Sequence, residues 1–341
     1  MVDKVTSEER LQALCQKGCN FLGTRYSILG GAMSWVSERQ LVSAISNAGG
    51  FGVLACGAME PERLDEEIKA TRELTKFPFG VNLITMHPKL DELIDICLDN
   101  KVSHIVLAGG LPREKVIKRI KDSNVKVMVF APTLALAKRL VRSGAQAVVI
   151  EGSEAGGHVG PVSLNVLVQE ILPHLKDVPV FVAGGIGRGE AMLSYLEQGA
   201  AGVQLGTLFA ASKESIAHEN FKKSFLHANA RDAAVTTQLD ERFPVIPVRA
   251  IENDASKKFM KHQAKVIESY QAGNVSLKEA QLEIEHFWAG ALKKAVIDGD
   301  VENGSLMAGQ SVGLVKEIFP VQDIINTLWG QALEAIQKKK Y

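Results

Sequence analysis

The stretch Ala145-Gln-Ala-Val-Val-Ile150, followed directly by Glu151-Gly-Ser-Glu-Ala-Gly-Gly-His-Val-Gly160, decides both the fold and the site that we predict for this chain. The first six residues are mostly apolar and rich in β-branched side chains, which predicts a fully buried strand. The strand opens into glycines, two carboxylates and one imidazole. Glycine lets backbone N–H groups approach a ligand closely, and Glu151, Glu154 and His158 bring acid–base chemistry to one place. We therefore predict the active site here and expect the rest of the chain to be its scaffold.

Apolar runs of this kind recur along the chain and alternate with helical patterns. They are mostly continuously apolar, which is typical of parallel strands covered by helices on both faces. Eight βα units within about 200 residues fit a barrel better than an open doubly wound sheet. We therefore predict an α/β fold, a (β/α)8 TIM barrel with a C-terminal helical insertion beside the barrel mouth. The predicted strands are 27–29, 51–55, 79–84, 103–107, 125–130, 145–150, 178–183 and 201–205, and the helices between them are 37–47, 61–75, 88–100, 112–122, 133–143, 164–175 and 188–198.

The sequence departs from the barrel pattern at both ends. Residues 1–23 predict a helical extension that precedes the barrel of residues 24–232. Residues 233–304 contain a stretch broken by prolines and then polar helical patterns, so we predict a helical insertion that forms a lid or substrate pocket beside the mouth. Residues 305–341 are predicted to return to the barrel, with an amphipathic helix at 319–339.

The composition is that of an ordinary globular protein and argues against several classes of function. The 341 residues hold 39 Lys and Arg against 39 Asp and Glu, so there is no basic field for nucleic acid and no polybasic patch for a membrane. No apolar run approaches the roughly 20 residues that span a bilayer, and the charged N-terminus is unlike a secretory signal. The four cysteines lack the paired spacing of a zinc site. We expect a cytoplasmic protein with reduced thiols, no metal, and neither nucleic acid nor a membrane as partner.

Small residues follow several predicted strands at their carboxyl ends, where the active sites of such barrels lie. The turns after the last two strands carry Gly184, Gly185, Gly206 and Thr207. Their backbone N–H groups, with the Thr207 hydroxyl, are suited to a phosphate group at a helix N-terminus. The alternative is that residues 184–187 are only a tight turn between a strand and a helix. Two such turns on the final strands favour a phosphate site.

Four further side chains are candidates for the site. A lone histidine is more often structural than catalytic, but His158 lies in a glycine-rich loop beside two carboxylates, which favours a role in proton transfer. We assign no role to the other seven histidines. Asn82 interrupts an apolar strand, and its amide must be paired either with neighbouring backbone or with the polar edge of a ring. Met33 and Met307 are suited to packing on a flat ring or to filling gaps in the core.

These motifs resemble those of one family, the FMN-dependent barrels of the nitronate monooxygenase (2-nitropropane dioxygenase) and enoyl-acyl-carrier-protein reductase II group. The resemblance runs from about residue 25 to residue 335, and the Glu-Ala-Gly-Gly-His string at 154–158 is its most specific part. The matching stretches are Leu29-Gly-Gly-Ala-Met33, Asn47-Ala-Gly-Gly-Phe-Gly52, Gly80-Val-Asn82, Glu151-Gly-Ser-Glu-Ala-Gly-Gly-His158, Ala183-Gly-Gly-Ile186, Val203-Gln-Leu-Gly-Thr207, Val296-Ile-Asp-Gly-Asp300 and Gly304-Ser-Leu-Met-Ala-Gly-Gln310.

The resemblance implies an FMN cofactor at the mouth of the barrel and a set of residues that bind it. His158 matches the active-site histidine of the family, which implies that it is the catalytic residue. Asn82 and the backbone of residues 31–33 would contact the isoalloxazine ring, and the turns after the last two strands would hold the phosphate. The residues implied to bind FMN are Gly31, Ala32, Met33, Asn82, Glu151, Gly156, Gly157, Ala183, Gly184, Gly185, Gln204, Leu205, Gly206, Thr207 and Met307.

The family has two branches, and this sequence resembles the reductase branch more closely. Glu151 stands where nitronate monooxygenases carry Gln, and the closing stretch at 299–310 is also similar to the reductases. Leu208 departs from the reductases, which carry Arg there, and residues 1–22 have no counterpart. The leading hypothesis is NAD(P)H-dependent reduction of 2-enoyl thioesters in fatty acid synthesis, with His158 donating a proton or polarising the thioester carbonyl. The alternative is a nitronate monooxygenase that oxidises alkyl nitronates with oxygen.

The reductase hypothesis implies NADH or NADPH as electron donor and a small-molecule or acyl-carrier-bound substrate; a homodimer is a further expectation. A carboxylate at Glu151 is expected to lower the flavin potential, so Glu151→Gln is expected to raise it. Two other classes remain as weaker alternatives. One is a metabolite-binding barrel without redox chemistry. The other is a nucleotide-binding barrel of the IMP-dehydrogenase type, which shares the turn at 183–186 but requires a cysteine nucleophile after the sixth strand.

Overall fold

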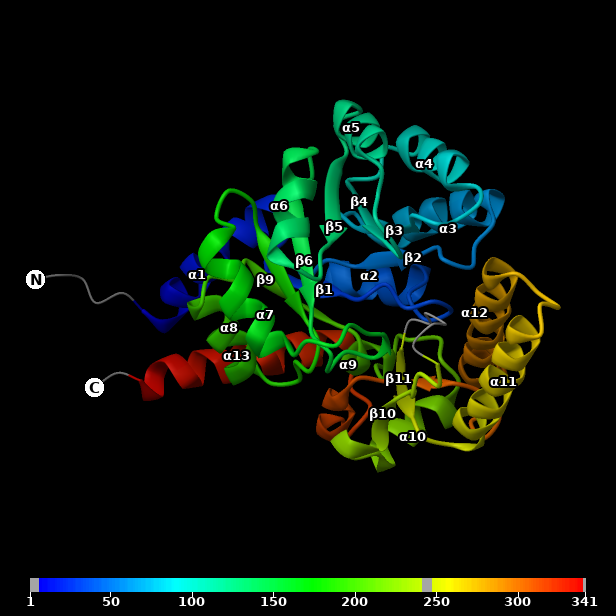
Figure 1. Cartoon of the computed structure of the whole chain (residues 1–341). Helices are drawn as coiled ribbons and strands as arrows, with labels where there is room; N and C mark the ends of the chain where they lie inside the picture. The colour runs from blue at the N-terminus through cyan, green and yellow to red at the C-terminus, as the bar shows by residue number, and fades with distance from the viewer. Residues whose placement is uncertain (1–5, 241–246, 340–341) are drawn as a thin grey trace, which may run out of the picture.

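A barrel of eight parallel strands forms the centre of the protein (Figure 1). The computed structural model describes residues 6–240 and 247–339. The strands neighbour one another in the order β1-β9-β8-β6-β5-β4-β3-β2. Leu29 also bridges Phe51 in parallel, which brings β1 and β2 together and closes the barrel. The predicted (β/α)8 fold is confirmed. The barrel strands are β1 (Ile28–Gly30), β2 (Val53–Ala55), β3 (Gly80–Ile84), β4 (His104–Ala108), β5 (Lys126–Phe130), β6 (Ala147–Glu151), β8 (Val180–Ala183) and β9 (Gly202–Leu205).

Helices follow seven of the strands and cover the outside of the barrel, as the sequence predicts. Their first residues explain where several of them begin. Glu38 accepts hydrogen bonds from the N–H groups at the start of α2, Pro61 occupies the first turn of α3, and the Thr133 side chain caps α6. These helices are α2 (Arg39–Asn47), α3 (Pro61–Leu74), α4 (Leu90–Asp99), α5 (Glu114–Asp122), α6 (Leu134–Arg142), α7 (Leu164–Ile171) and α8 (Gly189–Glu197).

The eighth barrel position is filled by a helix from the end of the chain. Only the short helix α9 (Thr207–Ala210) follows β9 directly. Helix α13 (Val321–Lys338) packs against α8 and α2, so it occupies the place of the helix that would normally follow the last strand. The intervening chain, which includes α10 (Glu219–His227), is therefore inserted between the eighth strand and its helix.

A second, small sheet lies beside the barrel and was not predicted from the sequence. Its strands are antiparallel and come from three separate parts of the chain, at residues 157–158, 233–251 and 306–307. Two of them lie within residues 233–304, so the insertion predicted there as helical also contains strands. Strand β11 pairs with the other three and is the centre of this sheet. The strands are β7 (Gly157–His158), β10 (Ala233–Val235), β11 (Val248–Ile251) and β12 (Leu306–Met307).

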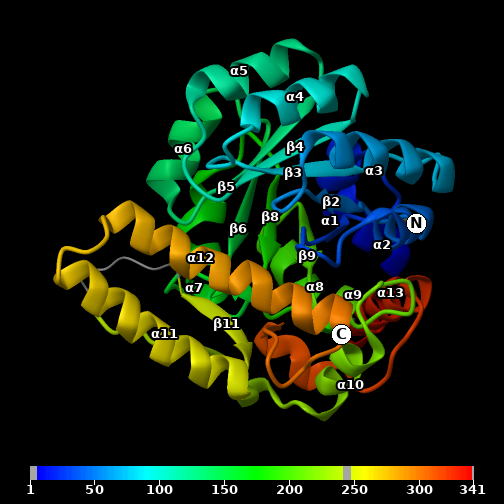
Figure 2. The ribbon, with the colours of Figure 1, turned by 90° about the vertical axis from the view of Figure 1, so that its right-hand side faces the viewer.

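The insertion carries its own apolar core. Helices α11 (Asp254–Gln271) and α12 (Leu277–Lys293) lie side by side (Figure 2). They lie at the opposite end of the molecule from α1 and the last turns of α13 (Figure 1). The rings of Phe259 and Trp288 are 4.3 Å apart, and both belong to a buried cluster with Val248 of β11. The helical pair and the second sheet are therefore packed as one unit. Shorter helical turns lie at Leu172–His174, Ala230–Asp232, Lys294–Asp298 and Gln310–Leu314.

Helix α1 (Ser7–Leu22) is docked against the barrel. A capping box at Thr6 starts the helix, and the Glu8 carboxylate accepts a hydrogen bond from Trp329 Nε1 of α13 at 3.2 Å. At the other end of the helix, the Phe21 carbonyl accepts hydrogen bonds from His104 and Lys126 at the amino ends of β4 and β5. The extension therefore covers the end of the barrel opposite to its mouth.

His104 is buried at this end of the barrel between two aromatic rings. Its ring centre lies 5.0 Å from that of Phe21 and 4.7 Å from that of Phe51. Nε2 lies 3.0 Å from the Phe21 carbonyl, which can only accept, so Nε2 carries the hydrogen in the neutral ring. Burial lowers the pKa of His104 from 6.5 to about 3, and the nearby Lys126 ammonium acts in the same direction.

We expect the contribution of His104 to stability, measured as the difference between the wild type and His104→Gln, to become less favourable as the pH drops below about 6.5. The unfolded chain protonates His104 near pH 6.5, whereas the folded protein keeps it neutral down to about pH 3. Between these values the unfolded state binds one more proton, which lowers the free energy of unfolding by up to about 1.4 kcal/mol per pH unit. Denaturant unfolding of the wild type and of His104→Gln at pH 4.5, 5.5 and 6.5 measures this slope. Equal slopes in the two proteins would contradict the assignment.

Within residues 6–240 and 247–339, no helix is both long enough and apolar enough to cross a membrane. In the same ranges, no group of three or more His, Cys, Asp or Glu side chains is arranged to hold a metal ion.

Candidate active site

The loop after β6 leads from Glu151 at the end of the strand to His158. Gly152 N–H donates a hydrogen bond to Ala183 O of β8 at 3.0 Å, which holds the start of the loop against the neighbouring strand. A Cβ atom on Gly152 would lie 2.3 Å from Leu164 N, so only glycine fits at this close approach. The sequence therefore positions this loop through its glycines, as predicted, at the carboxyl ends of the strands.

The side chain of Glu154 caps the N-terminus of the next helix, α7. Its carboxylate accepts a hydrogen bond from Leu164 N–H, the first residue of α7, at 2.9 Å. The side chain of Ser163, which precedes the helix, accepts no capping hydrogen bond. A carboxylate at a helix N-terminus is favourable. The backbone carbonyl of Glu154 also accepts from Gln310 N–H at 2.9 Å. Glu154 is thus used as a helix cap, and Glu151 and His158 are the other acid–base groups of this loop.

His158 is presented by a strand. It lies on β7 opposite Val248 of β11, and Val159 N–H extends the pairing by donating to Pro247 O at 3.0 Å. The His158 side chain is exposed. The position of the imidazole is thus set by the second sheet, while Glu151 is set by the barrel.

Glu151 is the last residue of β6 and lies opposite Ala183 of β8. Its side chain keeps partial exposure, although protein atoms otherwise surround it. Among the described residues, none donates a hydrogen bond to this carboxyl group. Burial without a compensating partner raises the pKa of Glu151 to about 8. Glu151 is therefore mainly protonated at neutral pH and can donate a hydrogen bond or a proton there.

The turns after β8 and β9 carry backbone donors without internal acceptors. In the described part of the chain, no residue accepts a hydrogen bond from the backbone N–H of Gly184, Gly185, Gly206 or Thr207. Gly184 and Gly185 have φ values of 105° and 69°, in the left-handed region that favours glycine. Four free N–H groups in two adjacent turns fit a phosphate group. The Thr207 hydroxyl accepts a hydrogen bond from Gly309 N–H at 3.0 Å.

The loop after β1 lies against the turn after β9. Gly31 N–H donates to Leu205 O at 2.8 Å, and a Cβ atom on Gly31 would lie 3.8 Å from the Gln204 side chain. The sulfur of Met33 would lie 3.6 Å from a Cβ atom on Gly206. The residue between them, Ala32, packs against the apolar core of the barrel. The structure therefore brings these predicted flavin-binding residues together at one edge of the mouth.

Asn82 on β3 is buried, and one side of its amide is paired with backbone. Its Nδ2 donates to Val106 O of β4 at 3.1 Å. Among the described residues, none donates to the side-chain carbonyl of Asn82. The Cys56 thiol donates to the backbone carbonyl of Asn82 at 2.7 Å, and burial raises the pKa of Cys56 to about 12. The Asn82 amide is therefore held in place while its carbonyl oxygen stays available to a ligand.

Residues 306–309, near the end of the chain, pack against the loop after β6. A Cβ atom on Gly156 would lie 2.5 Å from Gly309 N, so the segment packs directly on the glycines before His158. The sulfur of Met307 lies 3.7 Å from the Cβ position of Gly157. Gly157 itself has a φ of 77°, which favours glycine. Met307 thus lies next to the predicted site, as expected.

Two residues of this region were not identified from the sequence. Arg249 of β11 is 7% exposed and donates hydrogen bonds to the backbone of the loop after β6. Burial lowers the pKa of Arg249, and the Glu154 carboxylate opposes this shift. Trp35, in the loop after β1, has a φ of 65° and lies with its ring 5.2 Å from the Lys293 ammonium at the end of α12. Neither residue belongs to a recognisable motif, so the sequence carried no signal for them.

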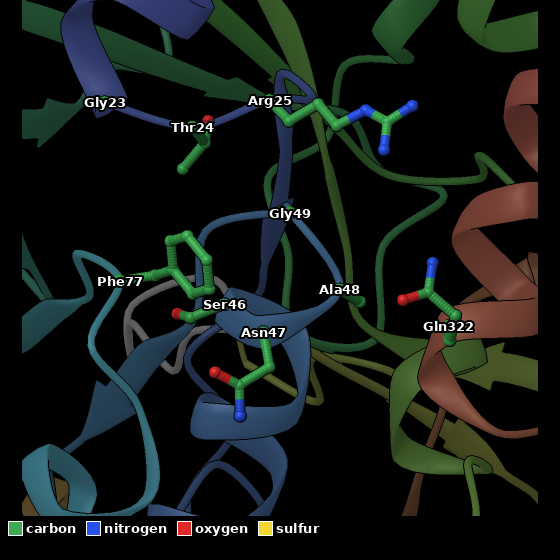
Figure 3. A pocket seen from close by; sticks show the side chains of 10 residues that line it. Gly23, Thr24, Arg25, Ser46, Asn47, Ala48, Gly49, Phe77 and Gln322 are labelled. Atoms are coloured by element: carbon green, nitrogen blue, oxygen red, sulfur yellow. The ribbon is translucent and has the colours of Figure 1, made fainter.

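A separate pocket of about 260 Å³ lies at the amino ends of the strands (Figure 3). It is formed where α1, the end of α2 and the start of α13 approach one another. Active sites of such barrels lie at the carboxyl ends of the strands, and the donors described above are there. This pocket is therefore distinct from the candidate site. Its lining includes Arg25, Ser46, Asn47, Phe77 and Gln322.

Comparison with known proteins identifies relatives that span nearly the whole chain. The model of the nitronate monooxygenase family matches residues 17–93 and 89–331. The structure of FabK from Thermotoga maritima is similar, with a TM-score of 0.84 and 35% identity over 94% of this chain and 96% of that chain. A nitroalkane oxidase from Streptomyces ansochromogenes has a TM-score of 0.76 and 26% identity over 94% of this chain and 99% of that one. A (3aS,4S,5R,7aS)-5-hydroxy-7a-methyl-1-oxo-octahydro-1H-indene-4-carboxyl-CoA dehydrogenase from Rhodococcus jostii (strain RHA1) is 28% identical over 92% of this chain and 95% of its own length.

Proposed function

Because this chain belongs to the nitronate monooxygenase family, we propose that it is an FMN-dependent enzyme that reduces 2-enoyl thioesters with NADH or NADPH. The family resemblance stated from the sequence is confirmed, and the chain is a flavin-type oxidoreductase. The observation that carries the substrate proposal is the likeness to FabK, an enoyl-acyl-carrier-protein reductase II, which at 35% exceeds the 26% identity to the nitroalkane oxidase over the same 94% of the chain.

Two further observations support a thioester substrate. The relative from Rhodococcus jostii is named for a carboxyl-CoA compound, which is also an acyl thioester. Apolar side chains are exposed in the loops that follow β3 and β4, where Met86 is 69% exposed and Leu111 is 49% exposed. Such side chains at the mouth of the barrel suit the apolar part of an acyl group.

The residues at the mouth fit an FMN cofactor. The free N–H groups of Gly184, Gly185, Gly206 and Thr207 would hold its phosphate. The backbone of residues 31–33 and the Asn82 carbonyl would border its ring, with Met307 closing the site. When bound, FMN supplies hydride chemistry that no protein side chain provides.

The two acid–base groups have different roles in this proposal. Glu151, protonated at neutral pH, donates a hydrogen bond toward the mouth of the barrel. His158, exposed on β7, donates the proton that the α-carbon of the substrate gains, or polarises the thioester carbonyl by a hydrogen bond. The proton on Glu151 avoids a buried negative charge beside the site.

A second candidate function is that of a nitronate monooxygenase. The family model and the nitroalkane oxidase structure both favour it. In that case His158 would accept a proton from a nitroalkane instead of donating one, and no nicotinamide would be needed.

Two assays on the flavin-loaded protein distinguish these functions. We expect crotonyl or longer enoyl thioesters to drive oxidation of NADH or NADPH under anaerobic conditions. We expect no oxygen uptake with propyl nitronate in the absence of nicotinamide. Absence of thioester turnover would reject the reductase proposal, and oxygen uptake with the nitronate would support the second candidate in its place.

The raised pKa of Glu151 changes the expected effect of Glu151→Gln on the flavin potential. Below about pH 8 Glu151 is neutral, so Gln in its place leaves the midpoint potential of the bound flavin nearly unchanged. Above that pH the wild type carries a carboxylate, and a nearby charge worth roughly 2–4 kcal/mol lowers the potential by on the order of 50 mV for a two-electron couple. Potentiometric titration of both proteins at pH 6.5 and 9 measures the difference. A shift of equal size at both values would contradict this.

A further inference from the structure

Arg249 connects the second sheet to the loop that carries the acid–base groups. Its Nε and Nη2 donate hydrogen bonds to Ser153 O at 3.0 and 2.8 Å. Its Nη1 donates to Ala233 O of β10. The side chain is buried. Among the described residues, no carboxylate lies within ion-pairing distance of its guanidinium, and its hydrogen bonds go to two backbone carbonyls. Burying a guanidinium without a carboxylate partner costs free energy, which its hydrogen bonds to the two carbonyls offset.

The backbone of Arg249 contacts the same loop a second time. Arg249 lies opposite Gly157 in the pairing of β11 with β7, directly before the pair of Val248 with His158. Strand β7 has only two residues, and so short a strand is marginal without additional contacts. The side chain therefore holds the first part of the loop, at Ser153, while the backbone holds its last part, at Gly157.

We propose that Arg249 is a positioning residue that fixes the His158 strand relative to Glu151. Glu151 is placed by the barrel and His158 by the second sheet, so their mutual position depends on what joins these two units at the loop. Arg249 joins them through one side chain. The proposal rests on the proposed function only in its kinetic test, because the positioning itself does not depend on which substrate is used.

The forked shape of the guanidinium explains why arginine stands here. Its planar group donates to Ser153 O and to Ala233 O at the same time, whereas a lysine ammonium at the end of a flexible stem is not held in such a fork. Arg249→Lys is therefore expected to retain one of the two connections. Arg249→Met keeps a long apolar stem and removes all three hydrogen bonds.

Hydrogen exchange of the flavin-loaded protein tests the positioning directly. We expect the amides of residues 152–160 to exchange roughly 10-fold or more faster in Arg249→Met than in the wild type, with an intermediate rate in Arg249→Lys. Arg231→Met is the matched control, because the Arg231 side chain is 90% exposed and its ion pair with Asp232 is long, at 3.9 Å. Wild-type exchange of the loop in both Arg249 variants would overturn the proposal. If Arg249→Met does not fold, Arg249→Lys alone decides.

A double-mutant cycle with His158→Ala tests the consequence for the reaction, with whichever substrate the wild type turns over. We expect Arg249→Met to lower kcat by on the order of 10-fold with little change in KM, and to lower it less than about 2-fold when His158 is already Ala. If Arg249→Met instead caused a general structural defect, it would lower kcat by the same factor in the wild type and in His158→Ala. That result would overturn the proposal. If neither substrate is turned over, the proposed function fails, and the exchange measurement still decides on Arg249.

Discussion

His158→Ala is expected to keep its flavin and to lose turnover by on the order of 10²-fold or more, the range in which a positioned general acid or base contributes. The imidazole is exposed and held on β7 by backbone pairing with Val248. Its removal therefore leaves the strand, the second sheet and the turns after β8 and β9 in place. The loss is expected in kcat, since the missing group acts on the reacting atoms.

His174→Ala is the matched control for this prediction. His174 is exposed in the turn after α7, outside the candidate site. It is expected to keep wild-type turnover. Stopped-flow or steady-state rates, together with the visible spectrum of the bound flavin, measure both parts of the expectation. Wild-type rates in His158→Ala would reject the catalytic assignment, and a colourless variant would show that His158 also helps to retain the flavin.

Gly206→Asp is expected to weaken FMN binding by roughly 10²-fold. Gly206 has a φ of −107°, which any residue adopts, and a Cβ atom there would meet only Met33 Sδ at 3.6 Å. The substitution is therefore sterically tolerated. Its carboxylate would stand beside the free N–H groups that we assign to the phosphate, and like charges a few ångströms apart near a protein surface repel by roughly 2–4 kcal/mol. About 1.4 kcal/mol corresponds to a 10-fold change in Kd.

Gly206→Asn separates charge from size, because it has the shape of Asp without the charge. We expect its FMN affinity to stay within about 5-fold of that of the wild type. Fluorescence titration of the apoprotein with FMN at low and high salt measures the Kd, and the loss in Gly206→Asp is expected to shrink as salt screens the repulsion. Equal affinities of the Asp and Asn variants would place the phosphate away from this turn.

The local sequence pattern is enough to predict the barrel and the position of its glycine-rich turns. Each barrel strand is a short apolar run with turn residues at its ends. This local pattern predicts the strands because helices cover the outside of the barrel, so burial selects apolar residues along each strand. The glycines mark where the backbone must turn or approach a ligand. Gly184 and Gly185 show this, since their positive φ values and free N–H groups are properties of the local chain. The same holds for Glu151, which ends an apolar strand.

The way in which these pieces are joined follows from contacts between residues that are far apart in the sequence. The His158 strand is two residues long and gains its partner from β11, far along the chain, so no local pattern indicates it. Glu154 was indistinguishable from Glu151 as a carboxylate in the loop, yet contact with Leu164 N–H turns it into a helix cap, while burial keeps Glu151 protonated.

Arg249 and α13 are two further features whose role the local sequence does not indicate. Arg249 appears in the sequence as one basic residue among many, and α13 as an amphipathic helix at the end of the chain. Packing makes the first a link between the second sheet and the loop after β6, and the second the eighth helix of the barrel. The physical reason is that periodicity and turn chemistry act between neighbours in sequence. Hydrogen-bond partners, burial and the pKa values that follow from them depend on residues that only the folded chain brings together.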